Sequence, residues 1–559
     1  MLGTKRSRGL SVGGAVAALV VTATLTALGT GAGAAPTPPP SAPTAGKLSA
    51  AALTHQYLAH PEKAPAASRE AFASMRDLSG RAEASGSARK TMPRASTRVR
   101  GPMADQVFNR DTTGFPQNEE SVTACSSRPN VVLSGTNDYR GILDPEQNFT
   151  GWYFSTDGGK SVRREGLLPA IDFGGGTMVP SGGDPVDASD ASCNLYAVDL
   201  NFDPADLNPS GVGLYKTTPA RLSACSGGTD PACWPDRTAV VQSSDPRTFI
   251  DKPWMYVGNS GGQTVVWVVY TEFTCDPGCN NYTSNAIKAV RCTTDLVCGK
   301  PQLISGTQPS IQFGDVTIGP DGSTYITWEQ DNDLDTGFAP PEHERFWIRV
   351  AAPGSTTFGP AHPVANEQLN AGIAPLHAND FRISTYPKND VKMVNGHPRV
   401  FVVWEGCRSR PLDDATCEEP AIKLRYSDDQ GSSWTSTKVL SAGGDNYFPT
   451  ISANRGGSSV AVAWYTNRFD RVFHNRQDVE LATVSVNGAV RARHRLTRLS
   501  NESEADPLLG GAFIGDYIEV YAQRNRALIG YNANYRSEQL LGEGFAVPQQ
   551  DNYLARHRM

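Results

Sequence analysis

The fold is decided by the stretch Tyr426-Ser427-Asp428-Asp429-Gln430-Gly431-Ser432-Ser433-Trp434. It follows the spacing Ser-x-Asp-x-Gly-x-x-Trp at every fixed position. In such a turn the aspartate carboxylate accepts backbone N–H bonds, and glycine tolerates a positive φ. The closing tryptophan can then pack beneath the hairpin. The stretch therefore predicts a tight β-hairpin whose turn is held by Asp429.

A second copy of this motif lies far upstream, at Phe154-Ser155-Thr156-Asp157-Gly158-Gly159-Lys160-Ser161-Val162. It departs from the spacing only at the last position, where valine replaces tryptophan. Weaker versions occur at residues 351–358 and 485–488. A hairpin motif that recurs along one chain predicts a repeated architecture.

The segments around the motifs have the composition of β-strands. Short β-branched and aromatic runs alternate with Gly, Asp, Asn and Pro, and long helical periodicity is absent after Phe108. The clearest runs are residues 130–135, 263–270, 323–328, 399–404, 459–464 and 527–531. The sequence therefore predicts an all-β class.

The strands recur as units, each with a turn-rich polar lead before its first strand. The leads are Gly183-Asp184-Pro185, Asp251-Lys252-Pro253-Trp254, Gln308-Pro309-Ser310, Asp380-Phe381-Arg382, Tyr447-Phe448-Pro449 and Gly515-Asp516-Tyr517, with residues near Glu119-Glu120 supplying one more. Four-stranded sheets repeated around an axis account for such a pattern. We expect a β-propeller of seven four-stranded blades, with six as the alternative.

With both hairpin motifs on it, residues 115–555 resemble the sialidase-like (neuraminidase-like) superfamily of secreted bacterial β-propellers with Asp-box (BNR) repeats. The segments 464–468 and 513–517 add to the likeness. In that family the Asp-boxes lie in outer hairpins, away from the central funnel. The resemblance therefore implies a structural role for Asp157 and Asp429, because unrelated functions share this fold.

The resemblance implies an exo-acting sialidase-type glycoside hydrolase on acidic glycans. Sialidases use three arginines for a carboxylate, a Tyr–Glu pair as nucleophile and an aspartate as acid/base. The first arginine of the family lies in a Phe/Tyr-Arg-Ile-Pro stretch. The nearest likeness, Phe381-Arg382-Ile383-Ser384, lacks the proline and falls in the fifth unit, so the arginine triad does not transfer. A non-catalytic propeller that binds a glycan or protein, and a polysaccharide lyase, are the alternatives.

Candidate site residues follow from position in the repeat, because unit leads crowd the propeller axis. The catalytic candidates are Asp516, Tyr517, Asp380, Arg382 and Glu120, and the leads also supply the substrate-binding candidates Asp184, Asp251 and Tyr447. Arg468 and Arg536 follow apolar strands, and they are added as substrate-binding candidates because arginine binds carboxylates well. Glu119 and Asp315 occupy similar positions. The alternative is structural: aspartates that bond turn N–H groups between blades, and arginines in inter-blade salt bridges.

One acidic loop has the spacing of a calcium ligand set. Its carboxylates are Asp331, Asp333, Asp335 and Glu342. The glycine falls one place late and Pro340-Pro341 interrupt the loop, so a solvated acidic loop is the alternative to a structural calcium. No cofactor is expected to be required.

The first part of the chain differs from the rest. Residues 1–35 combine a basic start with a small apolar run that ends in Ala32-Gly33-Ala34, which predicts a cleaved signal peptide and a secreted protein without a membrane anchor. Residues 36–105 form a flexible Pro/Ala/Ser-rich linker or pro-region, with a candidate helix in Leu48–Leu78, and residues 106–559 form the propeller domain. A net charge of −6 argues against nucleic acid. We expect a monomer.

The ten cysteines fit an exported protein. An even count in an oxidising compartment favours disulfides, and close spacing predicts the pairs Cys225/Cys233, Cys292/Cys298 and Cys407/Cys417. The alternative is a zinc site that includes Cys275, Cys279, Cys292 and Cys298, but the spacing fits zinc poorly.

Overall fold

The structure is a computed structural model that describes residues 50–63, 73, 76, 105–276, 282–307, 310–331, 344–367, 379, 381, 383, 386–408, 419–509, 514–540 and 546–559. All of these residues belong to one compact unit, residues 42–559. The helices within the described ranges are all too short or too polar to cross a bilayer.

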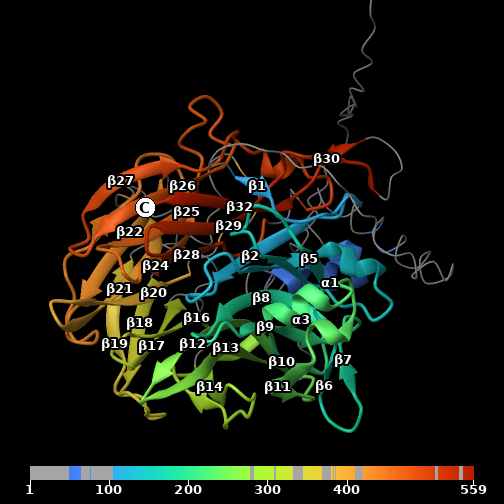
Figure 1. Cartoon of the computed structure of the whole chain (residues 1–559), viewed down its shortest axis with the longest axis horizontal. Helices are drawn as coiled ribbons and strands as arrows, with labels where there is room; N and C mark the ends of the chain where they lie inside the picture. Colours follow the sequence, from blue (N-terminus) through green and yellow to red (C-terminus); the bar gives the residue numbers. More distant parts are fainter. Residues whose placement is uncertain are drawn as a thin grey trace, which may run out of the picture. The chain divides into compact units, whose positions relative to one another are not determined.

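Seven four-stranded antiparallel sheets make up most of the described chain (Figure 1). The strands of each sheet are given from the innermost outward. The first sheet contains β2 (Gln117–Ala124), β3 (Val132–Asp138), β4 (Thr150–Ser155) and β5 (Arg164–Leu167), and the second contains β8 (Ser181–Ser189), β9 (Leu195–Phe202), β10 (Ser210–Thr217) and β11 (Asp236–Ser243). The third contains β12 (Thr248–Ser260), β13 (Gln263–Cys275), β14 (Tyr282–Thr293) and β15 (Gln302–Leu303), and the fourth contains β16 (Ile311–Ile318), β17 (Thr324–Asp331), β18 (Glu344–Ala351) and β19 (His362–Glu367). We number these blades 1 to 4.

Blades 5 to 7 follow in the same way. They are β20 (Lys388–Val394), β21 (His397–Cys407), β22 (Pro420–Ser427) and β23 (Lys438–Val439); β24 (Asn446–Ala453), β25 (Ser459–Thr466), β26 (Asp478–Ser485) and β27 (Val490–Arg495); β28 (Glu519–Gln523), β29 (Arg526–Ala533), β32 (Asp551–Arg558) and β1 (Gln106–Val107). The innermost strands contact one another in the order β2, β8, β12, β16, β20, β24, β28 and back to β2. The predicted seven-bladed propeller is confirmed.

Blade 7 joins both ends of the domain. β1 comes from the start of the propeller and pairs with β32 from its end, with Gln106 opposite Leu554 and Val107 opposite Tyr553. The remaining small elements connect or decorate the blades. They are η3 (Tyr139–Leu143), β6 (Ile171–Asp172), β7 (Met178–Val179), α3 (Pro219–Ala224), η4 (Pro231–Cys233), η6 (Ser503–Ala505), β30 (Ser537–Glu538) and β31 (Val547–Pro548).

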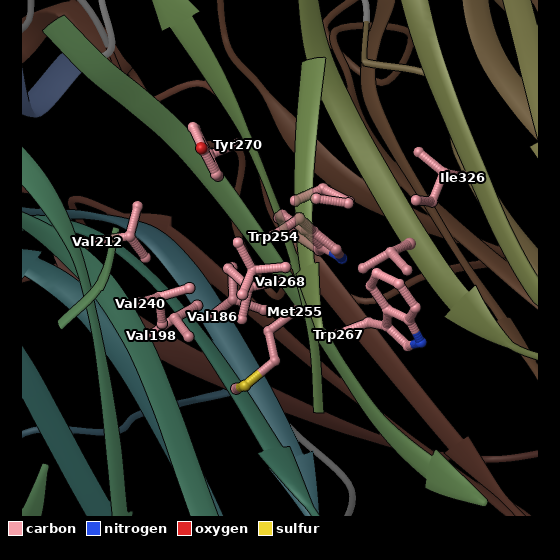
Figure 2. Close-up of a cluster of buried hydrophobic side chains, with 14 of the residues drawn as sticks. Val186, Val198, Val212, Val240, Trp254, Met255, Trp267, Val268, Tyr270 and Ile326 are labelled. Carbon is pink, nitrogen blue, oxygen red and sulfur yellow. The ribbon is translucent and has the colours of Figure 1, made fainter. Parts of the chain in front are cut away.

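The hydrophobic core lies between neighbouring blades. Figure 2 shows Val186 and Val198 of blade 2 beside Trp254 and Val268 of blade 3. Because each blade is covered on both faces, the middle strands are apolar at consecutive positions rather than at alternate ones. β13, for example, is buried without interruption from Val265 to Tyr270.

The two Ser-x-Asp-x-Gly segments form hairpins between the third and fourth strands of blades 1 and 5. In blade 5, Ser433 donates to Asp429 through its backbone N at 2.8 Å and its hydroxyl at 2.5 Å, and Gly431 donates its N–H to Ser427 Oγ at 2.8 Å. Asp157 of blade 1 accepts the equivalent bonds. Both lie at the blade edge, which agrees with a structural role.

The disulfides connect loops and blades. Cys125–Cys193 joins blades 1 and 2, while Cys225–Cys233 and Cys292–Cys298 close short loops. The last two pairs confirm the prediction. Cys275 and Cys407 are also disulfide-bonded, and the described residues hold no free thiol, which contradicts the zinc alternative. Cys417, the predicted partner of Cys407, lies outside the described residues.

Upstream of the propeller, one helix forms within the predicted helical stretch. α1 (Ala50–Ala59) is followed by the short helix η1 (Pro61–Lys63). Ala52, Thr54, His55 and Tyr57 of α1 are buried against the propeller. α1 therefore packs against the propeller domain.

Candidate functional site

The innermost strands share a backbone irregularity near the propeller axis. The pairing slips by one residue in β2, β12, β16 and β24, and it slips twice in β8. The slips fall within the sequence leads in β2, β8, β12 and β24, and at residues 312–315 in β16. One non-glycine residue at each slip has a left-handed φ; these are Glu119 (60°), Asp184 (55°), Lys252 (53°), Phe313 (55°) and Phe448 (51°). Such backbone is costly for these residue types and concentrates at functional sites.

Carboxylates from several blades meet at this level of the axis. We call Glu119, Asp184, Asp251 and Asp516, together with Lys252, the acidic cluster. Glu119 Oε1 accepts the backbone N–H of Asp516 at 3.0 Å, and Lys252 Nζ lies 3.3 Å from Asp516 Oδ2. All five side chains are at most 3% exposed. The charged side chains of the acidic cluster, which come from blades 1, 2, 3 and 7, therefore lie together in one buried region.

Asn137 of β3 links two members of the cluster. Its amide nitrogen donates to Glu119 Oε2 at 2.9 Å, and its carbonyl oxygen accepts the backbone N–H of Asp184 at 2.7 Å. Glu119 therefore receives one N–H donor on each carboxylate oxygen.

Asp184 is the member whose protonation is most altered. Burial raises its pKa well above the ordinary value, the charges of Glu119 and Asp251 raise it further, and Lys252 opposes them. Like charges in a site with little water cannot all ionise. The Asp184 carboxyl therefore keeps a proton at pH values where an exposed aspartate has lost it.

Aromatic rings close the axis beneath the acidic cluster. We call Trp254, Tyr386 and Tyr517 the aromatic plug. The Trp254 ring centroid lies 5.5 Å from that of Tyr386 and 5.3 Å from that of Tyr517. Tyr517 donates its hydroxyl to the Pro185 carbonyl at 2.8 Å. Burial raises the Tyr517 pKa well above its ordinary value, and nearby carboxylates raise it further.

A buried lysine lies against this plug. Lys388 Nζ is 2.7 Å from the Trp254 ring centroid and 3.5 Å from that of Tyr386, with Asp315 Oδ1 at 4.0 Å. Burial lowers the Lys388 pKa well below its ordinary value, against the opposing charges of Asp315 and Glu519. The cation–π contacts of the Lys388 ammonium group with Trp254 and Tyr386 offset part of the hydration energy that the group loses on burial.

On the other side of the plug an axial cavity of about 360 Å³ extends toward the C-terminal ends of the innermost strands. Its wall includes Asp315, Asp390 and Glu519. Asp315 Oδ2 accepts the backbone N–H of Asn389 at 2.6 Å, Asp390 Oδ2 that of Ala453 at 2.6 Å, and Glu519 Oε2 that of Val122 at 2.8 Å. Each carboxylate therefore ties one blade to the next, as the structural alternative anticipates.

The predicted site residues divide into three groups. Asp516, Tyr517, Asp184 and Asp251 come together at the axis, with Glu119 beside them. The Glu120 side chain points instead between blades 1 and 7, where its Cβ faces Gly530. Asp380, Arg382, Asp333, Asp335, Glu342 and the Asp331 side chain lie outside what the structure describes.

The other predicted binding residues sit within blades 6 and 7. Arg468 forms a bidentate pair with the buried Glu480 at 2.5 and 3.1 Å. Arg536 Nε lies 3.5 Å from Asp551 Oδ2, and Tyr447 donates its hydroxyl to Gln477 Oε1 at 2.9 Å. These contacts connect segments of the same blade, and Tyr447 belongs to the innermost strand β24.

Sequence reasoning did not single out Asn137, Lys388, Trp254 and Tyr386 as site residues. An X-Pro dipeptide at the innermost strand could have located Trp254, Tyr386 and Lys388. Trp254 follows Lys252-Pro253, and Tyr386-Pro387 is followed by Lys388. Within the described ranges no group of three or more His, Cys, Asp or Glu side chains has the geometry to hold a metal ion.

The sequence matches no protein-family model, and a search of curated proteins found no match. Solved structures with partial likeness include the Hadza microbial sialidase Hz136, with 11% identity, a TM-score of 0.40, and coverage of 67% of this chain and 65% of that one. An α-L-arabinanase from Penicillium chrysogenum has 13% identity, a TM-score of 0.38, and coverage of 65% and 94%. A GH93 α-L-arabinofuranosidase from Fusarium graminearum has 10% identity, a TM-score of 0.40, and coverage of 81% of this chain and 97% of that one. The fold assignment rests on the sheet topology.

Proposed function

We propose that the protein is a glycoside hydrolase whose reaction takes place at the acidic cluster. The observation that carries the proposal is the pairing of a proton-retaining carboxyl, Asp184, with the doubly hydrogen-bonded carboxylate of Glu119. Glycoside hydrolysis needs one carboxylic acid to protonate the leaving oxygen and one carboxylate to act on the opposite side. The cluster contains both.

In this proposal Asp184 gives its proton to the glycosidic oxygen as the bond from that oxygen to the anomeric carbon breaks. The Glu119 carboxylate stabilises the positive charge that develops on the sugar ring. Water then adds its hydroxyl group to the anomeric carbon, and its remaining proton restores Asp184. The ammonium group of Lys252, paired with Asp516, balances part of the negative charge of the surrounding carboxylates.

A neutral glycan suits this centre better than the acidic glycan that a sialidase-type reaction requires. The cluster carries four carboxyl groups and one ammonium group, so a substrate carboxylate would meet repulsion. Tyr517 is also a poor nucleophile here, because its hydroxyl is bonded to Pro185 and its pKa is raised. Tyr517 therefore has a positioning role in this proposal.

The test is hydrolysis of a panel of aryl glycosides, including an α-L-arabinofuranoside and an α-sialoside, by the full chain. Asp184→Asn should lower kcat by about 10² to 10⁴-fold, the range for loss of a general acid. Asp295→Asn, at a surface carboxyl that is 87% exposed, is the matched control and should leave kcat unchanged. Failure to hydrolyse any glycoside, in protein whose Asp184 reacts with a carbodiimide, overturns the proposal.

A non-catalytic binding propeller is the second candidate. The observation in its favour is that the cluster and the plug are almost entirely buried, and that the cavity carboxylates bond neighbouring blades. In that case a glycan array would detect binding without turnover, and Asp184→Asn would change stability but not glycan affinity.

We also propose that the protein acts outside the cell after removal of residues 1–35. The disulfides support this, because such bonds persist in oxidising compartments. Mass spectrometry of the mature protein from the culture medium, with Pro36 as its first residue, is the expected result.

A further inference from the structure

Helix α1 lies on the side of the propeller where the acidic cluster is. It contacts β8, whose slip carries Asp184 (Figure 1). Its buried side chains pack in one hydrophobic cluster with Tyr139, Phe149 and Phe202. These three residues belong to η3, to the segment before β4 and to the end of β9, so α1 bridges blades 1 and 2.

His55 is the centre of this contact. Its ring lies 4.6 Å from that of Phe149 and 5.0 Å from that of Phe202, edge-on to both. The side chain is 5% exposed, and Nε2 has no hydrogen-bond partner among the described residues. An unbonded buried polar atom weakens the contact. The helix therefore docks through aromatic packing. The unbonded Nε2 atom makes this docking less favourable than it would be with an apolar ring in the place of His55.

The Tyr139 side chain lies between α1 and the surroundings of the acidic cluster. Thr54 Oγ1 lies 2.7 Å from the Tyr139 hydroxyl. The Asn118 side chain is hydrogen-bonded to that hydroxyl, and the Glu119 charge acts on it too. Tyr139 therefore links α1 to the surroundings of the Glu119 carboxylate.

The propeller does not need α1 to complete its sheets. Every blade has its four strands within residues 106–558, and the ring closes through β1 and β32. A ten-residue helix is not stable by itself in water, so α1 holds its shape only while docked. It can leave without breaking a strand.

We propose that α1 is a displaceable cover that keeps the acidic cluster inaccessible, and that Tyr139, Phe149 and Phe202 form the platform for a sugar ring once it leaves. This inference concerns the regulation of the proposed hydrolytic site and rests on that function. Aromatic rings beside convergent polar groups are the usual lining of a ligand site. In the covered form, His55 takes the place of the sugar.

Carbodiimide labelling of carboxyl groups, mapped by mass spectrometry, tests the cover without relying on catalysis. His55→Asp places a charge between two phenylalanine rings and should release α1, so labelling of Glu119 and Asp184 should rise at least tenfold. His55→Phe, the matched control, should leave labelling at the level of the natural protein. Asp295 should react equally in all three proteins, because it is exposed throughout.

Hydrogen exchange of residues 50–59 reports whether the helix has left, and Ala52→Arg serves as a second variant because Ala52 is fully buried. Faster exchange with unchanged labelling of Glu119 and Asp184 overturns the inference. So does unchanged exchange in both variants. If labelling rises and aryl glycosides are still not hydrolysed, the cover stands and the proposed hydrolase function fails.

Discussion

Lys252 Nζ lies 3.3 Å from Asp516 Oδ2, with the two side chains only 2% and 3% exposed. The pair joins blade 3 to blade 7 across the propeller axis. Removal of one partner leaves a buried charge without its counterion, which costs about 3–5 kcal/mol. We therefore expect Lys252→Met to lower the free energy of unfolding by that amount in urea titrations, and Asp516→Asn to lower it by less, because other carboxyl groups of the acidic cluster remain near the ammonium group.

The double variant Lys252→Met/Asp516→Leu completes the thermodynamic cycle. Because it removes both charges, it should be more stable than Lys252→Met alone. Equal losses in the double variant and in the sum of the single variants would mean that the two groups do not interact.

Lys388 gives a prediction with a definite sign. Its folded pKa is below the ordinary 10.5, so the unfolded chain binds the additional proton between the two values. The natural protein should therefore become more stable as pH rises toward 10.5, and less stable as pH falls. Lys388→Met should flatten this part of the curve of melting temperature against pH. A slope identical to that of the natural protein would contradict the assignment.

Release of α1 should depend on acid. Burial lowers the His55 pKa from 6.5 to about 3, so between these values only the undocked helix takes up a proton. Docking is strongest above pH 6.5 and weakens by up to roughly tenfold per pH unit as pH falls toward 3. Hydrogen exchange of residues 50–59 at pH 7 and pH 5 measures this. In His55→Phe, which cannot titrate, the two pH values should give equal protection after correction for intrinsic exchange.

The Cys125–Cys193 disulfide should contribute to the stability of blades 1 and 2. It links residues separated by 68 positions, and a loop of that length gives about 2–4 kcal/mol when the bond restricts the unfolded chain. Cys125→Ser/Cys193→Ser should lose that amount by denaturant titration. Cys292→Ser/Cys298→Ser, which opens a separation of only 6, should lose less.

The fold could be predicted because its signals are local. The Asp429 turn, the X-Pro leads and the apolar middle strands each depend on neighbouring residues, and together they gave seven blades. The fourth and fifth leads show the limit. β16 begins at Ile311 and β20 at Lys388, after the positions of the leads at residues 308–310 and 380–382. In blade 4 glycine follows the left-handed Phe313, whereas proline follows the left-handed residue in blades 2, 3 and 6, so the lead of blade 4 gives a weaker signal.

The site was predicted less completely, because it depends on which way a side chain points across the axis. Glu119 and Glu120 are adjacent, yet one faces the cluster and the other faces Gly530, and only the slip in β2 decides between them. Arg468 has the chemistry of a carboxylate ligand, but its partner is Glu480, twelve residues away in the same blade. A pattern of residue types does not distinguish an internal counterion from a substrate.

The pairing of β1 with β32 also determines when the domain can become whole during synthesis. Gln106 of β1 can pair with Leu554 only after β32 has been synthesised, so six sheets can form while the seventh still lacks strands. Contacts between such distant positions form slowly, because a very long loop must close first. Until β32 is added, blade 7 consists of β28 and β29 alone, and the exposed edge of β29 is open to pairing with another chain.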